Sequence, residues 1–273
     1  MIARRLAPIL LLCVSLVARA QAQEAETDAA AGKQPIEITA EGGIEWDRNA
    51  QTYTARGAAQ ARRGALSVSA DTLIAHYRDG AGGGSEIYEL EAVGQVRLVS
   101  QSAIVTGQRA VYDVASRTVT VTGENLKLET GTDVLTARDR LEYSEGAREA
   151  SAYGEVTVVR EGRRLEADAV RASLAPGPAG ELALAKVEAT GNVRIATERE
   201  FISADRGTYD VDKQFATLAG SVKVTQDQNQ LNGEYAEVDL KTGVSRLLGA
   251  PPGSSGGKVK GLVLPGAAPE PGG

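Results

Sequence analysis

The sequence predicts an all-β protein, an elongated and twisted antiparallel structure built from about six repeated strand units. Three observations predict it. Glycine recurs at similar intervals, alternating apolar residues follow most of these glycines, and no segment combines helix caps with a 3.6-residue apolar period. Successive glycines of the series are separated by 29 to 37 residues: Gly57, Gly94, Gly123, Gly154, Gly191, Gly220 and Gly249.

The segment before the repeats, residues 1–20, has the layout of a secretory signal peptide. A basic start precedes a short apolar run from Leu6 to Val17, and small residues follow this run. The run is shorter than the roughly 20 residues that a membrane-spanning helix needs. We therefore expect cleavage after Ala20 or Ala22 and export of the mature chain, with a retained anchor as the alternative.

Composition disfavours several classes of function. The chain has a net charge of −6, and removal of three arginines with residues 1–20 leaves −9, which disfavours a nucleic-acid partner. The one cysteine, Cys13, lies in the apolar run, and a single histidine, His76, cannot build a His-metal cluster or a Ser–His–Asp triad. We expect no catalytic residues, no metal site and no cofactor, and we interpret His76 as a solvated strand end and Trp46 as a packed hairpin residue.

Each glycine lies within an alternating run that predicts one strand. On one face of the run around Gly94, for example, Ala92 precedes the glycine and Val96 follows it, so the glycine itself is expected to face inward. A glycine inside a strand usually marks a bend or a close approach of backbones. We expect the strands to bend over a common crease, where the glycines turn a corner, leave space for a ligand between two walls, or do both. The predicted inward residues are Val96, Leu98, Val119, Val121, Val156, Val158, Val193, Ile195, Val222 and Val224.

A second alternating run follows in each unit, and a turn and a third run lead to the next glycine. The apolar pair after Gly123 is displaced by one residue, which predicts a bulge. The two longest units carry Gly- or Pro-rich insertions, residues 77–89 and 173–183, at corresponding turns. The chain therefore contains six units or two sets of three. The second runs are residues 69–77, 106–113, 136–143, 166–173, 203–210 and 232–239.

Charged residues also recur in the repeats. Paired carboxylates can hydrolyse glycosides, but a catalytic pair needs one copy, so we interpret the repeated aspartates as turn caps. Basic residues between the paired apolar positions point to the opposite face, as a solvated surface or, less favoured, as a basic ridge for anionic groups. The aspartates are Asp71, Asp113, Asp139, Asp168, Asp205, Asp210 and Asp239, and the basic residues are Arg97, Lys127, Arg194 and Lys223.

Residues 34–98 resemble the start of the LptA or OstA-like family of periplasmic lipopolysaccharide-transport proteins. The likeness consists of a P-I-x-I opening, a glycine ending the first hairpin, an A-D-x-L strand, a Gly-rich turn and a Gly-x-Val restart. Near the end, "GKVKGLVLPG" resembles the last strand of the same family. The resemblance covers about residues 34–265.

This resemblance implies a fold and a task. It implies a twisted, slightly open β-jellyroll whose apolar interior shields lipid A acyl chains, so the ten inward residues would contact lipid. It also implies a periplasmic bridge without enzymatic activity, which binds lipopolysaccharide, an LptC-like inner-membrane protein and the N-terminal domain of LptD, or further copies of itself head to tail. The alternatives are a secreted structural or adhesin repeat and, less favoured, a polysaccharide-active enzyme on a β-solenoid.

The repeats and the resemblance together predict how the chain is divided into segments. Residues 34–249 form the jellyroll repeats, 250–257 a Gly/Pro/Ser linker, 258–265 the last edge strand and 266–273 a flexible tail. The open ends of such a sheet leave unpaired strand edges that another chain can complete. The expected edge residues are Ile36, Ile38, Val259, Leu262 and Leu264.

Overall fold

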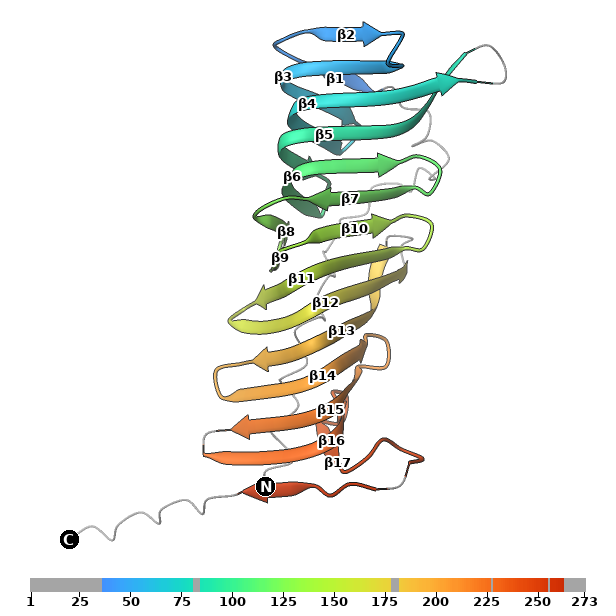
Figure 1. Cartoon of the computed structure of the whole chain (residues 1–273). Coiled ribbons are helices and arrows are strands. Elements are labelled where there is room, and N and C mark those ends of the chain that lie inside the picture. Colours follow the sequence, from blue (N-terminus) through green and yellow to red (C-terminus); the bar gives the residue numbers. More distant parts are fainter. Residues whose placement is uncertain (1–35, 81–83, 178–181, 227, 255, 263–273) are drawn as a thin grey trace, which may run out of the picture.

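The structure is a computed structural model that describes residues 36–80, 84–177, 182–226, 228–254 and 256–262. The predicted signal peptide, the tail 266–273 and Leu264 lie outside these residues. The described residues form one antiparallel sheet of 18 strands, so the predicted all-β fold is confirmed. Figure 1 shows the strands stacked in order along an elongated, twisted molecule.

Strands that pair in the sheet are antiparallel throughout, and most of them are consecutive in the chain. Their bounds are β1 (Glu37–Thr39), β2 (Ile44–Asp47), β3 (Thr52–Arg63), β4 (Leu66–Asp79), β5 (Ser85–Val99), β6 (Ala103–Asp113), β7 (Thr118–Thr122), β8 (Leu126–Thr130), β9 (Asp133–Ala137), β10 (Arg140–Ser144), β11 (Glu149–Arg160), β12 (Arg163–Pro176), β13 (Leu182–Ala196), β14 (Glu200–Asp210), β15 (Phe215–Gln226), β16 (Asn229–Asp239), β17 (Val244–Leu248) and β18 (Lys260–Leu262).

The sheet is folded lengthwise into two walls. The first half of β3 pairs with β2, whereas its second half pairs with β1. In the same way β6 pairs with β7 and β8, β11 with β10 and β9, and β16 with β17 and β18. We call the wall that contains β2, β7, β10 and β17 the first wall, and the wall that contains β1, β8, β9 and β18 the second wall. The remaining strands run through both walls.

The walls meet at a crease formed by β-bulges. The register of every pairing between two long strands shifts at the repeated glycine, as between Tyr153 and Val156 on β11. There the glycine and the residue after it lie opposite a single residue of the neighbour, which bends the strand. Six of the seven glycines have a positive φ, Gly249 being the exception, and Gln95 and Asn192 after two of them are left-handed as well. The predicted corner is therefore confirmed.

The glycines of the crease do not point to the interior, and in this respect the sequence analysis is wrong. A Cβ on Gly94 would overlap the carboxylate of Asp71 and would lie only 2.9 Å from the Cβ of Asp71. A Cβ on Gly191 would overlap Asp168 in the same way. The missing side chain thus makes space for a carboxylate on the outside of the bend. Val96 nevertheless faces inward, as Ala92 does, because the two bulge residues between the paired segments leave the alternation of inward and outward residues on this strand unchanged.

The repeated aspartates fall into two groups. Asp113, Asp210 and Asp239 cap turns, since each carboxylate accepts hydrogen bonds from backbone N–H groups two or three residues further on. This confirms the turn interpretation for these three. For Asp71, Asp139, Asp168 and Asp205 the interpretation is wrong, because all four pack against glycines of the crease.

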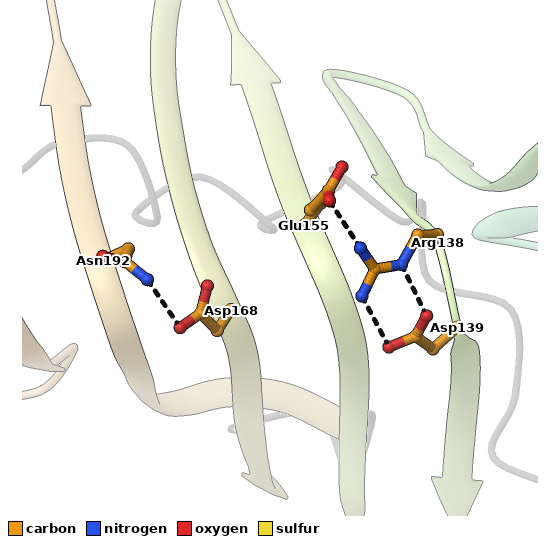
Figure 2. A network of polar contacts seen from close by, with 5 residues as sticks. All are labelled: Arg138, Asp139, Glu155, Asp168 and Asn192. Carbon is orange, nitrogen blue, oxygen red and sulfur yellow. Dashed lines mark hydrogen bonds and ion pairs between the residues drawn. The ribbon is translucent and has the colours of Figure 1, made fainter.

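Figure 2 shows two of these crease contacts. Asn192, the residue after Gly191, donates from Nδ2 to Asp168 at 2.9 Å. On the neighbouring bulge, Arg138 donates to both oxygens of Asp139 and to Glu155. The hydrogen bond from Arg138 also holds the pKa of Asp139 below its usual value. The outside of the crease is therefore a polar, hydrogen-bonded ridge.

The inside of the crease is sealed by alternating large and small side chains. Five large residues next to the crease on the second wall are at most 1% exposed. Each faces a small residue on the following strand, and this alternation lets the two walls approach each other without a void. The pairs are Val96 with Gly107, Leu126 with Ala137, Val156 with Ala167, Val193 with Ala204 and Val222 with Gly233. We call these ten residues the crease row.

Candidate functional site

The inner side of the folded sheet carries one continuous apolar cluster, and it is the candidate functional site. The cluster runs from Ala70 on β4 to Val238 on β16 and contains residues of both walls. A regular strand places alternate residues on one face, so a chain with this period fills the inner face with apolar side chains and leaves the charged ones outside.

All ten residues that the sequence analysis expected to face inward belong to this cluster or pack against it. Four of them, Val96, Val156, Val193 and Val222, lie in the crease row and are almost completely covered. Leu98, Val119 and Val158 lie further from the crease and are only partly buried. Val121, Ile195 and Val224 are buried in the cluster. The part of the apolar surface that stays partly exposed therefore lies away from the crease.

Sequence analysis missed other apolar residues of the same surface. They are partly buried, pack against the cluster and lie on the strands between the glycine-bearing ones or nearer the outer ends of the walls. The signal that identifies most of them is the register, because they face an inward residue of a neighbouring strand, as Val105 faces Leu98 and Leu231 faces Val224. Val211 and Leu240 directly follow β14 and β16. The group is Val68, Leu73, Val105, Leu128, Leu135, Leu184, Val211, Leu231, Leu240 and Leu247.

Both ends of the sheet expose apolar residues and unpaired strand edges. Within the described chain β1 and β2 pair only with β3, and β17 and β18 pair only with β16. At the first end Ile38 and Ile44 are about half exposed, and at the last end Leu262 is 62% exposed. The predicted edge strand 258–265 is described only as far as Leu262, with β18 pairing to β16 through Lys260, Gly261 and Leu262.

Trp46 gives the first end an aromatic character. Its indole N–H donates to the hydroxyl of Tyr77 at 2.8 Å, and its ring stacks on Tyr53. Half of the Trp46 surface nevertheless stays exposed, with Arg48 over the ring at 4.3 Å from its centre. The expected packed hairpin residue is thus held in place but not covered.

The outer face of the sheet is charged. Arg97, Arg194 and Lys223 are exposed, and Lys127, which is partly buried, pairs with Glu129 at 2.6 Å. Arg194 lies 3.8 Å from Glu166 on the neighbouring strand. This pattern matches the solvated surface that the sequence analysis favoured over a basic ridge.

A charged pair lies at the inner side of the second wall. Arg160 at the end of β11 donates through two nitrogens to Asp133 at the start of β9, and both residues are buried. A paired charge tolerates burial that an isolated charge does not. The apolar surface is therefore bounded here by a fixed ion pair, away from the crease.

A match to a protein-family model shows which family this chain belongs to. The family model described as "LptA/(LptD N-terminal domain) LPS transport protein" matches residues 37–145 and again residues 138–244. The chain belongs to this family. The two matches together span most of the described sheet, and they account for the two sets of three units in the glycine spacing.

The chain is similar to LptH from Pseudomonas aeruginosa, the LptA-homologous periplasmic component of the lipopolysaccharide transport device, with 13% identity over 86% of this chain and 99% of that chain and a TM-score of 0.22. The comparison with curated proteins found no match.

Membership of the LptA/LptD N-terminal family makes this a transport protein rather than an enzyme. The carboxylates of the crease accordingly have a structural role, with hydrogen bonds to the bulges beside them. In the part of the chain that the structure describes, no helix has the length and apolarity of a membrane span. The candidate functional site is therefore a long apolar inner face with an open strand edge at each end.

Proposed function

We propose that the inner face binds the acyl chains of lipopolysaccharide and shields them during passage from the inner to the outer membrane. The observation that carries this proposal is the continuity of the apolar cluster through both family repeats. A single bound molecule needs only a local patch, whereas a transport path needs an apolar face along the whole molecule.

The energetics support acyl chains as the occupant. Burying one CH₂ group contributes about 0.8 kcal/mol, so a chain of about a dozen carbons gains on the order of 10 kcal/mol. The protein has a net charge of −6 before any processing. An anionic lipid gains little from long-range attraction to such a protein, so apolar burial must provide the affinity.

Photo-crosslinking tests which side holds the lipid. A photoreactive residue at Leu98 or Val158, which are apolar and partly buried, should capture lipopolysaccharide in cells. One at Arg97, next to Leu98 on the outer face, is the matched control and should capture little. Equal capture at Leu98 and Arg97 would refute the proposed inner site, and so would the absence of lipid from mass spectra of the purified protein.

We propose further that the open edges join this chain to other members of the transport bridge. The edges at β1 and β2 and at β17 and β18 leave backbone groups to be completed by another strand. The partners would be an LptC-like protein, the N-terminal domain of LptD or another copy of this chain. Proline cannot donate to a strand ladder, so Ile38→Pro should abolish partner pull-down at the first end.

The control for Ile38→Pro is lipid capture by the same variant. The far-UV circular dichroism and the crosslink at Leu98 should be retained, because the substitution lies in a three-residue edge strand. Normal pull-down of every partner by Ile38→Pro would contradict assembly through this edge.

We place the mature protein in the periplasm, as an exported chain that begins at Gln21 or Gln23. The support is the basic start, the short apolar run and the small residues before Ala20 and Ala22. The intact mass of the protein from the periplasmic fraction tests this directly. A full-length product retained with membranes would contradict it.

A further inference from the structure

His76 occupies an unexpected position on the outer face of the first wall. It lies on β4, two strands from the first end, where the sequence analysis expected a solvated strand end. Instead only a quarter of its side chain is exposed, and its buried Nε2 atom has no contact with a carboxylate oxygen shorter than the 3.6 Å to Glu91. A buried ring nitrogen without a partner is costly unless something else satisfies it.

Two carboxylates of the next strand surround that nitrogen. The register places Glu89 of β5 opposite His76, and Glu91 lies two residues further along the same face. The distances from His76 Nε2 to the carboxylate oxygens are 3.9 Å for Glu89 and 3.6 Å for Glu91. One ligand atom from each of the three residues lies within 4.8 Å of the other two.

We propose that His76, Glu89 and Glu91 form a binding site for one divalent metal ion of the zinc class. Zinc binds imidazole nitrogen and carboxylate oxygen at about 2.0–2.2 Å, so two ligands of a tetrahedral site are about 3.4 Å apart. The two separations from His76 Nε2, 3.6 and 3.9 Å, exceed this value by a few tenths of an ångström, within the range of side-chain rotation. Solvent would complete the coordination, since the three residues are only partly buried.

Arg109 on β6, the strand next to β5, orients the site. Its Nε donates to Oε1 of Glu91 at 2.6 Å, which leaves Oε2 of the same carboxylate directed at His76. A hydrogen bond to the distant oxygen of a ligating carboxylate is a common means of holding it in position. Together with Asp113, which the register places opposite Glu89, the region carries three acidic residues against one arginine. This excess of negative charge favours a bound cation.

The second family repeat fills the same place with a different set of charges. The residues 97 positions further along are Ser173, Lys186 and Glu188, and Ser173 faces Lys186 as His76 faces Glu89. Lys186 Nζ lies 2.5 Å from Glu188. The second repeat thus supplies a lysine ammonium to the carboxylate, whereas the first supplies a histidine and a second carboxylate. A metal ion would add positive charge to the first repeat, where Arg109 is paired with Glu91 and Glu89 faces a second carboxylate, Asp113.

This site does not depend on the proposed lipid function, because it lies on the opposite face of the sheet. It would join β4 to β5 near the end of β4, two strands that lie side by side in Figure 1. The sequence analysis expected no metal site because it counted histidines. The two glutamates become ligands only through the register of the neighbouring strand.

The test is zinc titration of the tag-free protein after treatment with EDTA. Isothermal titration calorimetry should find one saturable zinc site, and Co²⁺ at the same site should give the visible absorption of a low-coordinate centre. His76→Ser and Glu89→Lys, which introduce the residues of the second repeat, should each weaken zinc binding at least tenfold. Glu188→Gln is the matched control and should bind as the unmodified protein does.

Denaturant midpoints in EDTA show whether each variant is folded, and Glu89→Lys is expected to be at least as stable as the unmodified protein. The proposal is overturned if the unmodified protein shows no saturable zinc binding. It is also overturned if His76→Ser and Glu89→Lys both bind zinc normally, as they would if the metal bound only to phosphates of retained lipid.

Discussion

Asp71 and Gly94 in the first family repeat correspond to Asp168 and Gly191 in the second, and the same contact recurs at both places. Each glycine has a positive φ, and each makes space for the aspartate of the preceding strand. The outer face between these corners differs, because Glu89 in the first repeat is replaced by Lys186 in the second. The two repeats therefore share the crease and differ in how they balance surface charge.

The difference separates two kinds of constraint. At Gly94 and Gly191 the backbone requires a left-handed conformation and the neighbouring aspartate occupies the place of a side chain, so glycine is needed in both copies. On the outer face, water surrounds the side chains and an ion pair contributes only about 1 kcal/mol or less. Charges there are free to change sign between repeats, provided that the cross-strand neighbours change with them.

The largest expected effect comes from giving the crease a side chain. Gly191→Ala should lower the free energy of unfolding by roughly 3 kcal/mol, of which about 1–2 comes from the left-handed conformation and the rest from overlap with Asp168. Gly94→Ala should cost a similar amount through Asp71. Urea unfolding followed by circular dichroism measures both.

Gly146, in the turn between β10 and β11, is the control for these substitutions. A Cβ there would meet no atom within 4 Å, and its φ is not positive. Gly146→Ala should change stability by less than about 1 kcal/mol, in the stabilising direction if at all. Equal losses at positions 146 and 191 would mean that the crease does not depend on its glycines.

The corner and the inner face were predictable from the sequence, but the partners across strands were not. Alternation through Gly94 identified Val96 and Leu98 as inward because a strand has a period of two, and the bulge preserves that period. The same reasoning wrongly predicted that Gly94 faces inward, because a bulge residue with a left-handed backbone does not follow the alternation of a regular strand.

The aspartates show the same limit. Asp113 and Asp71 each follow an apolar run, yet Asp113 caps a turn within its own chain segment and Asp71 packs on a glycine of the next strand. Only the register distinguishes them. The cluster at His76 escaped notice for the same reason, because its three members lie on two strands.

A smaller effect should follow from exchanging the outer-face charges. Lys186 pairs with Glu188 and faces Asp210, whereas Glu89 faces Asp113. Like charges opposite each other on a sheet destabilise it by a few tenths to 1 kcal/mol. Lys186→Glu should therefore lower the free energy of unfolding by about 1 kcal/mol, and Glu89→Lys should raise it by about 0.5 kcal/mol in the absence of metal.

Both variants are to be compared in low and high salt. Screening should shrink both changes, because the side chains are partly exposed. A loss of stability in Glu89→Lys would contradict the view that the first repeat carries an excess of negative charge at this position.

The smallest expected effect distinguishes the turns after β6 and β14. The pKa of Asp113 is lowered mainly by the backbone N–H of Ser116, whereas the pKa of Asp210 is lowered first by the side chain of Lys213, whose Nζ lies 2.7 Å away. A lowered pKa in the folded state stabilises the protein above the unfolded value of about 3.9. That stabilisation is lost as the pH falls through the folded pKa.

Asp113→Asn and Asp210→Asn should therefore each make the stability less dependent on pH below about 4, since the amide keeps a carbonyl acceptor but does not titrate. In low salt the change should be greater for Asp210→Asn, because it also removes the pairing with Lys213. At about 1 M salt, where the Debye length is only about 3 Å, most of that extra contribution should disappear while the hydrogen-bonded part at Asp113 persists. Carboxyl pKa values from NMR titration at both salt concentrations measure the two contributions separately. If salt changed the pKa of Asp113 as much as that of Asp210, the two turns would not differ in the source of their stabilisation.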